Sequence, residues 1–413
     1  MTNYQNIETI AKRSVFWNMT FSILFALQSA VILMIVTRVI GTEDAGITSI
    51  AFATAYLMST VGLYGIRNFH ATDSGYWYSY KEYGRVRAIC SFFMVVCSLA
   101  YCFWKGYDAY KTNVILLVCL LKLGDVIEDL YHGEFQRVGR LDIAGLLGTL
   151  RLGIVYLGIV GVVLLTRNLL AAITLAVVLS FIVIIVTRII LERFLDKKST
   201  NHKGALLKIL ISCFPLFIMS FLSIYISNAP KYAIDNYLSE EKQALYAILS
   251  MPLFTINLLS EIIYRPQLFH MAELWNANNR SGFKKLIKKQ IRNITALTAI
   301  IIVAGAFIGL RILEILYGVP LDTLKMEFVV LLLSGGIVAV YNFFTACLTI
   351  IRKQAFMLGI SVFVMLTARA ISAPLVQHRG LAGATYLYLI LMLGEMAIVS
   401  VILFFCLISK KNL

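Results

Sequence analysis

Charged residues and proline are scarce in this 413-residue sequence. Only 14% of its residues are charged and six are proline, whereas soluble domains carry about 25% charged residues. Hydrophobic residues make up 60% of the chain, and the mean hydropathy is +0.82. This composition excludes an ordinary soluble domain and predicts an all-α polytopic membrane protein.

Sequence signatures of metal, disulfide and nucleotide chemistry are missing. The five histidines form no HExxH, and no GxxxxGK[ST] occurs. The seven cysteines form no CxxC pair and fall in apolar runs, where cysteine serves as a small hydrophobic residue. We therefore expect no cofactor, no metal site and no ATP hydrolysis, which leaves a proton or sodium gradient as the candidate energy source.

Long apolar runs are what the sequence has in abundance. A helix needs roughly 20 such residues to cross the hydrocarbon layer. No small-residue cleavage site follows the first run, so we expect it to be retained. The runs predict twelve transmembrane helices, at 14–37, 47–66, 88–104, 112–133, 143–165, 169–187, 209–229, 243–264, 293–310, 327–349, 355–375 and 381–408.

The basic residues favour one side of this predicted topology. The formal net charge is +15, and most Lys and Arg fall in the segments that are cytoplasmic if the N-terminus is inside. This distribution is the positive-inside bias of membrane proteins. It predicts that both termini are cytoplasmic, and it argues against nucleic acid as a partner.

The predicted helices form two equal sets. We expect an N-terminal six-helix bundle at 1–190, a basic cytoplasmic linker at 191–208 and a C-terminal six-helix bundle at 209–413. At an offset of 198 residues, the acidic turn in 39–50 lies over that in 237–248. The halves keep the same orientation, which predicts a parallel pseudo-repeat whose axis runs along the membrane normal.

Two predicted cytoplasmic loops combine apolar and basic residues. In 281–291, Phe283 and Ile287 share a helical face opposite four lysines, and 75–87 mixes aromatic residues with cations. Both patterns are typical of segments that anchor to anionic membrane lipids.

The fourth predicted helix carries charges on one face. Lys122, Asp125, Asp129 and His132 fall within an arc of about 80° at 100° per residue, with Glu128 off the arc. Each charge facing lipid at the centre of a helix costs about 2.5–3.5 kcal/mol. The face must therefore line protein or water, either as an internal ion pair or as a site where a carboxylate binds a proton or an ion.

Other buried polar residues extend this pattern. Arg151 has no acid within a helical turn and needs a partner on another helix or a bound anion, and Glu395 is a lone acid near mid-bilayer. Glu261 and Arg265 form an i, i+4 pair. Together these residues predict a polar, cation-bearing cavity between the two halves, suited to an anionic head group.

Three segments carry a resemblance to a known family. They are TRVIGTEDAGITSIAFA (37–53), SNAPKYAIDNYLSEEKQALYAI (227–248) and IRKQ (351–354). With the span count and the two equal halves, they resemble the polysaccharide-biosynthesis flippases of the MOP superfamily, the Wzx type.

The resemblance implies a transporter rather than an enzyme. It implies translocation of an undecaprenyl-diphosphate-linked oligosaccharide, such as an O-antigen, capsule or exopolysaccharide repeat unit, across the bacterial plasma membrane by alternating access. Other polysaccharide-assembly proteins and membrane lipids are the implied partners. A multidrug or cation antiporter of the MATE type is the alternative. An integral-membrane polysaccharide polymerase or glycosyltransferase is disfavoured, because the predicted external segments are all short.

The candidate site residues follow from these two lines of reasoning. For the diphosphate and sugar cavity we expect Arg38, Arg67, Lys122, Arg151, Asn228, Lys231, Tyr232 and Arg265. For ion coupling we expect Asp125, Asp129, Glu261 and Glu395.

Overall fold

The computed structural model describes residues 2–73, 75, 77–194, 202, 204–353 and 355–408. This described part of the chain is helical and contains no strand. Residues 195–201 and 203 of the predicted basic linker 191–208 and the last residue of the IRKQ motif lie outside the described residues. Ten described helices are long and apolar enough to cross a membrane, so the prediction of an all-α multi-pass membrane protein is confirmed.

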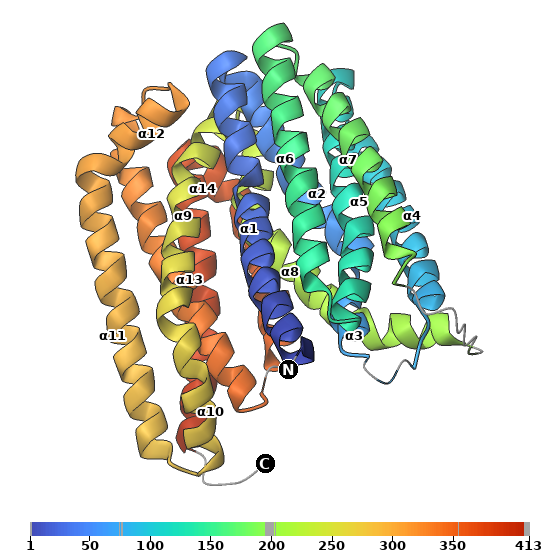
Figure 1. The fold of residues 1–413 in the computed structure, drawn as a ribbon. Helices are drawn as coiled ribbons and strands as arrows, with labels where there is room; N and C mark the ends of the chain where they lie inside the picture. The colour runs from blue at the N-terminus through green and yellow to red at the C-terminus, as the bar shows by residue number, and fades with distance from the viewer. Residues whose placement is uncertain are drawn as a thin grey trace. The chain divides into compact units, whose positions relative to one another are not determined.

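The first compact unit comprises residues 1–224. In this unit α5 packs against α2, α4, α6 and α7, while α1 packs against α6 and α2 (Figure 1). The most charged helix is thus enclosed by its neighbours, which removes its polar groups from lipid. Its helices are α1 (Thr2–Val39), α2 (Thr42–Leu63), α3 (Ile66–Ala71), α4 (Tyr80–Lys105), α5 (Ala109–Arg137), α6 (Leu141–Thr166), α7 (Leu169–Leu191) and the first part of α8 (Ala205–Tyr237).

Helix α2 is the other inner helix of this unit. Of the residues in its most apolar 18-residue segment, 83% are buried, the largest share among the ten spans. Its buried residues include many with small side chains, among them Ala51, Ser49 and Gly62. Small side chains let helix backbones approach closely in membranes, which explains how α2 packs against both α4 and α5.

The second compact unit comprises residues 225–413. In it α13 packs against α14, α9 and α11, and α10 lies against α11 (Figure 1). Its helices are the end of α8, α9 (Glu240–Tyr264), α10 (Leu268–Asn276), α11 (Arg280–Ala304), α12 (Leu310–Tyr317), α13 (Lys325–Ile350) and α14 (Phe356–Ile408).

Helix α14 is interrupted near its middle. Gly380 has φ 57° and ψ −132°, so the 53-residue element consists of two helices joined across a kink. Only glycine adopts this backbone region readily. Gly383 lies close behind, where a Cβ atom would stand 2.0 Å from the carbonyl oxygen of Leu375. The interruption coincides with the predicted break between the spans 355–375 and 381–408.

Helix boundaries recur between the two units. Helix α1 ends at Val39 and α2 begins at Thr42, while α8 ends at Tyr237 and α9 begins at Glu240. A shift of 198 residues carries each of the first pair onto the second. The two acidic turns therefore occupy the same place in the order of helices.

The structure differs from the sequence prediction in the two basic segments. Residues 80–87 belong to α4, because Ser79 and Glu82 form a capping box that starts the helix at Tyr80. Residues 281–291 are the first turns of α11 rather than a separate interfacial helix, because Asn279 caps the helix and neither proline nor glycine interrupts residues 283–304. Phe283 is buried there against Trp275 of α10.

Candidate functional site

The charges of α5 form a network inside the N-terminal unit. Lys122 Nζ donates to Asp125 Oδ2 at 2.8 Å and to Gln28 Oε1 of α1. Arg151 of α6 donates to Asp125 Oδ1 and lies 2.8 Å from Glu128 Oε2. Two cations and two carboxylates therefore meet where α1, α5 and α6 pack together.

Protein groups surround this network. The side chains of Lys122, Arg151 and Glu128 are at most 2% exposed. The Lys122 ammonium lies 4.5 Å from the ring centre of Tyr56 and 4.6 Å from that of Phe25, distances at which aromatic faces attract cations. The predicted polar face of α5 thus lines protein.

Arg151 finds the interhelical partners that the sequence required of it. Besides the two carboxylates of α5, Ser180 Oγ of α7 accepts from its Nη1 at 2.9 Å. Glu128 was placed off the charged face by helical periodicity, yet it joins the network because the long Arg151 side chain spans neighbouring faces of α5. Periodicity along one helix could not reveal this, since the partner belongs to another helix.

A second ionic group lies around Asp129. Arg87 of α4 donates to Asp129 Oδ2 at 2.7 Å, and Arg67 of α3 donates to Oδ1 at 3.3 Å. Nη1 of Arg87 donates to the carbonyl oxygens of Gly62 and Leu63 at the end of α2. The last carbonyl groups of a helix have no partner within the helix. Two guanidinium groups thus share one carboxylate.

Arg67 is the more accessible of this pair. Its side chain is 33% exposed, whereas that of Arg87 is 3% exposed. Arg87 was not among the predicted site residues, because it ends the aromatic and basic segment 75–87, which indicated only a lipid anchor. Its role as a buried partner of Asp129 depends on the packing of α4 against α2 and α5.

A third ionic group lies at the end of α5. Glu134 accepts from Arg137 at 2.8 Å and lies 2.8 Å from His70 Nε2 of α3. Burial lowers the pKa of His70, and its hydrogen bond to Glu134 acts in the opposite direction. Asp73 accepts from the Tyr83 hydroxyl and from two backbone amides, so this group ties the segment after α3 to α4 and α5.

Other predicted residues lie at the end of α1 and on α8. Arg38 is exposed at the end of α1. On α8, Asn228 and Lys231 are half-buried and Tyr232 is buried, stacked on Tyr225 at 5.6 Å. Residues 225–237 belong to the second compact unit.

In the C-terminal unit, the predicted acids have contrasting surroundings. Glu261 pairs with the exposed Arg265 at 2.6 Å and accepts from Asn257, which is bound in turn by Asn342. Glu395 is 4% exposed, and it interacts electrostatically with Tyr341 and Tyr388. Among the described residues, no cation pairs with Glu395. It is therefore the one predicted coupling acid that the described ion pairs leave unneutralised.

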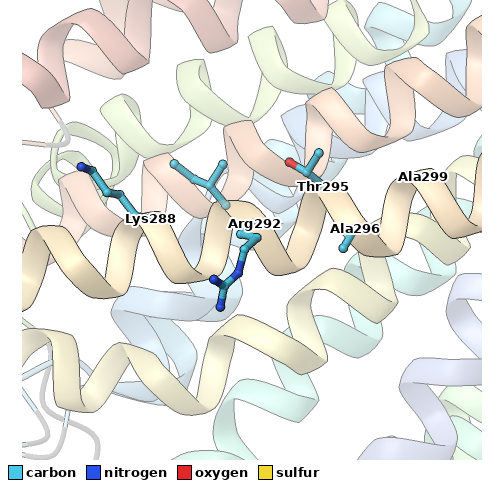
Figure 2. Close-up of a pocket in the computed structure, with 6 residues that line it drawn as sticks. Lys288, Arg292, Thr295, Ala296 and Ala299 are labelled. Carbon is cyan, nitrogen blue, oxygen red and sulfur yellow. The ribbon is translucent and has the colours of Figure 1, made fainter.

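A basic groove lies on α11. Lys288, Ile291 and Arg292 line a hollow of about 480 Å³ that continues along Thr295, Ala296 and Ala299 (Figure 2). An adjoining hollow of about 630 Å³ reaches α10 and adds further cations and apolar residues: His270, Leu274, Gly282, Lys285, Leu286 and Lys289. The groove thus joins a cationic end to an apolar end.

No group of three His, Cys, Asp or Glu side chains suited to a metal ion occurs among the described residues. The described cysteines are buried or half-buried free thiols.

Comparison with solved structures identifies the fold. The chain matches no family model, and it matches no curated protein sequence. It is similar to a multidrug-resistance MATE transporter of the MOP superfamily in an inward-facing conformation, with TM-score 0.63, 13% identity and coverage of 92% of this chain and 93% of the other. It is also similar to the MATE transporter VcmN of Vibrio cholerae in its bent form, with TM-score 0.55, 12% identity and coverage of 98% of this chain and 97% of the other.

A third similar structure is a MOP-superfamily transporter from Pyrococcus furiosus, with TM-score 0.53, 13% identity and coverage of 96% and 95%. That protein is described as having a binding pocket of reverse polarity that suggests a different function. The described part of the chain thus has the MATE-like fold of MOP-superfamily transporters. The predicted fold is confirmed at this level.

Proposed function

We propose that this chain is an alternating-access flippase that moves an undecaprenyl-diphosphate-linked oligosaccharide across a bacterial plasma membrane. The MOP-type fold supports transport, and the resemblance of residues 37–53 and 227–248 to Wzx-type proteins supports this substrate class. The anionic diphosphate requires cations that are not already neutralised by protein carboxylates.

Arg67 carries the proposal for an anionic substrate. Its guanidinium is one-third exposed and shares Asp129 with Arg87, so the group of three has an excess positive charge. A guanidinium with donors directed away from its carboxylate can bind phosphate oxygens in a bidentate manner. Arg67 is therefore our first candidate for the diphosphate.

The other candidate cations divide by their pairing. Lys122 and Arg151 direct their donors to protein acceptors, and Arg265 pairs with Glu261. This pairing makes Lys122 and Arg151 better suited to holding helices together than to binding substrate. Lys231 with Asn228 and Tyr232, and Arg38, remain candidates for the outer end of the cavity.

The proposed topology adds two crossings to the ten apolar helices. We propose that α5 crosses the membrane despite its charges, and that the two parts of α14 cross separately on either side of Gly380. This gives twelve spans, two six-helix halves joined by the basic segment 191–208, and cytoplasmic termini. The matching helix boundaries at an offset of 198 residues support the pseudo-repeat.

Glu395 is the proposed coupling acid. Asp125, Asp129 and Glu261 lie in ion pairs, and a carboxylate held by a permanent cation has little tendency to take up another ion. Glu395 lacks such a partner among the described residues and is buried. A proton or a sodium ion from the gradient would supply its counter-charge.

The test uses cells in which the native gene is deleted and replaced by variants. We expect deletion to leave lipid-linked oligosaccharide on the cytoplasmic leaflet. Arg67→Gln should accumulate at least tenfold more of it there than the wild type. Arg67→Lys should retain intermediate transport. Arg311→Gln, which removes an exposed arginine of α12, is the matched control. Normal surface polysaccharide in the deletion strain would overturn the proposed function.

Ion coupling has its own variant. Glu395→Gln removes the charge and keeps the shape of the side chain, so we expect it to abolish gradient-driven transport while the protein still folds. Glu261→Gln disrupts an exposed pair and should reduce transport far less. Wild-type transport by Glu395→Gln would exclude Glu395 as the coupling acid.

A MATE-type cation or drug antiporter is the second candidate. It is favoured by the acid–aromatic surroundings of Glu395 with Tyr341 and Tyr388, which suit an organic cation, and by the multidrug transporters among the similar structures. Increased drug sensitivity of the deletion strain, with unchanged surface polysaccharide, would favour this function.

Anionic membrane lipids are the proposed occupants of the α11 groove. No Asp or Glu occurs between Glu273 and Glu314, so the cations along α11 have no acidic neighbour in sequence. The groove places these cations beside exposed small and apolar residues, matching a phosphate head group with an acyl chain. We also expect other polysaccharide-assembly proteins, and no nucleic acid, as partners.

Native mass spectrometry of the purified protein tests this lipid site. We expect dioleoyl phosphatidylglycerol to be retained in preference to dioleoyl phosphatidylcholine. Lys288→Gln/Arg292→Gln should weaken that retention about 30-fold, since each cation near the surface contributes about 1 kcal/mol. Arg311→Gln/Lys325→Gln removes two exposed cations outside the groove. Equal losses in the two double variants would contradict a defined site.

A further inference from the structure

Two buried polar atoms of α5 face each other without hydrogen-bond partners. They are Glu128 Oε1 and His132 Nε2, which lie 4.0 Å apart. Their side chains are 2% and 3% exposed. This separation is too long for a hydrogen bond, and buried polar atoms in proteins are normally paired. Such a pair of orphaned atoms requires an explanation.

The hydrogen-bonding state of His132 explains why the pair stays open. The backbone of Ala144 in α6 forms a hydrogen bond with the imidazole. Because Nε2 has no partner, this bond belongs to Nδ1, which donates to the backbone carbonyl. A neutral imidazole protonated at Nδ1 presents a lone pair at Nε2. The Glu128 carboxylate likewise presents only lone pairs, so two acceptors face each other with no hydrogen between them.

The other carboxylate oxygen of Glu128 is occupied. Glu128 Oε2 lies 2.8 Å from Arg151 Nη2 of α6. This contact holds the carboxylate in place and directs Oε1 toward His132. The opening between Oε1 and Nε2 is therefore a fixed feature of the α5–α6 contact and not a consequence of a loose side chain.

The charged groups facing the pair balance. Arg151 of α6 and Arg67 of α3 are the two cations that act on it, and Asp125 and Asp129 of α5 are the two anions. From α1, the Phe21 ring packs edge-on against the imidazole at 5.1 Å. A proton added to this pair therefore meets no excess of positive charge. Because the pair is buried, water does not screen its interactions with these neighbours.

Space at the site limits what could bind. Gly148 of α6 approaches so closely that a Cβ atom there would lie 3.1 Å from His132 Cε1. Only two candidate ligand side chains converge, and no group of three metal-binding side chains is present among the described residues. The smallest cation, a proton, fits these limits.

We propose that Glu128 and His132 form a binding site for one proton in the N-terminal unit. The proton comes from water, adds to Nε2 or to Oε1, and converts one of the two acceptors into a donor to the other. No other bond is formed or broken, and release returns the proton to water. Proton binding weakens the Glu128–Arg151 ion pair while Asp125 continues to hold Arg151, so the contact between α5 and α6 depends on occupancy.

The use of this site for energy coupling rests on the proposed transport function, but its occupancy can be measured without transport. The purified full-length protein in detergent is titrated between about pH 5 and 8, the range in which histidine ordinarily changes charge. Proton uptake is measured directly, and infrared difference spectra report the carboxyl and imidazole bands. No substrate or gradient is present.

Two variants replace the site by a permanent hydrogen bond. In Glu128→Gln the side-chain amide can donate to Nε2, and in His132→Gln it can donate to Oε1. We expect each variant to take up one proton per chain less than the wild type over this range. Glu261→Gln, which alters a carboxylate paired at the protein surface, should take up as many protons as the wild type.

The outcomes separate the two proposals. Wild-type proton uptake by both Glu128→Gln and His132→Gln would overturn the proton site, whatever the transport assays give. Loss of one proton in both variants supports the site even if no oligosaccharide transport is found. Should one variant fail to fold, the other still decides, because each removes a different partner.

Discussion

The guanidinium group of Arg151 joins three helices of the N-terminal unit. It donates to Asp125 and lies in an ion pair with Glu128 on α5, it donates to Ser180 on α7, and it is itself part of α6. Its side chain is fully buried. Removing one member of a buried charged group leaves the others without compensation, which costs more free energy than the intact group contributes.

We therefore predict that Arg151→Gln lowers the free energy of unfolding by about 3–5 kcal/mol. The measurement is denaturant unfolding of the purified protein in detergent, with Arg311→Gln as the exposed control. Glu128→Gln/Arg151→Gln should lose less than the sum of the two single variants, because Asp125 retains Lys122 as its partner. Additive losses would contradict a shared network.

His70 makes stability depend on pH. Burial lowers the pKa of His70 in the folded protein, while the unfolded chain takes up its proton at the ordinary value of about 6.5. The contribution of neutral His70 to stability is thus complete above this value and is lost as the pH falls below it, by up to about 1.4 kcal/mol per pH unit.

Thermal unfolding between about pH 7.5 and 5.5 checks this prediction. We expect the midpoint of the wild type to fall more steeply with acidification than that of His70→Gln. His270→Gln, which changes a histidine whose side chain is 57% exposed, should keep the wild-type slope. Parallel curves for wild type and His70→Gln would show that the pKa of His70 is the same in the folded and the unfolded protein.

Helix α14 depends on two glycines. Gly380 occupies a backbone region that is strained for other residues, and Gly383 leaves no room for a Cβ atom beside the carbonyl of Leu375. We predict that Gly380→Ala and Gly383→Ala each destabilise the protein by about 1–3 kcal/mol. Denaturant unfolding in detergent measures the effect.

Gly359 of the same helix provides the matched control. A Cβ atom at this position would meet nothing within 4 Å, and alanine is the better helix former by about 1 kcal/mol. Gly359→Ala should therefore be neutral or stabilising. An equal loss in Gly359→Ala would attribute the effect to general sensitivity of α14 and not to its interruption.

Helix α5 separates what periodicity predicts from what packing adds. The spacing of Lys122, Asp125 and Asp129 predicted one polar face that avoids lipid, and the enclosure of α5 by α2, α4, α6 and α7 fulfils that requirement. Spacing could not assign Asp129 to Arg87 of α4 or Glu128 to Arg151 of α6. These pairs depend on how α5 is rotated against its neighbours.

For the complete chain, the proposed twelve-span topology predicts the side of each connection. Cysteine introduced as Ala109→Cys, at the start of α5, should react with a membrane-impermeant maleimide in intact cells, as should Gln377→Cys near the kink of α14. Gln136→Cys, at the other end of α5, should react only after the membrane is permeabilised. All three positions are exposed.

The labelling uses a background in which the half-buried Cys97 and Cys406 are replaced by alanine. Equal external labelling at Ala109→Cys and Gln136→Cys would mean that α5 does not cross the membrane. Protection of Gln377→Cys would mean that the two parts of α14 do not form separate crossings. Either result would contradict the proposed twelve-span topology.

Membrane insertion was predictable from the sequence because it depends on local properties. Hydropathy over about 20 residues places the helices, so the predicted ends agree closely with α6 and α13, and the break at 375–381 anticipates the interruption at Gly380. The same physics required Arg151 to find a partner outside its own helix.

The identity of the partners was decided by the tertiary structure. Arg151 and Glu128, Arg87 and Asp129, and His70 and Glu134 are separated by 23, 42 and 64 positions in the chain. Which of them meet depends on helix rotation and depth, and these are set by the packing of small residues such as those of α2. Charge spacing within one helix contains no information about either quantity.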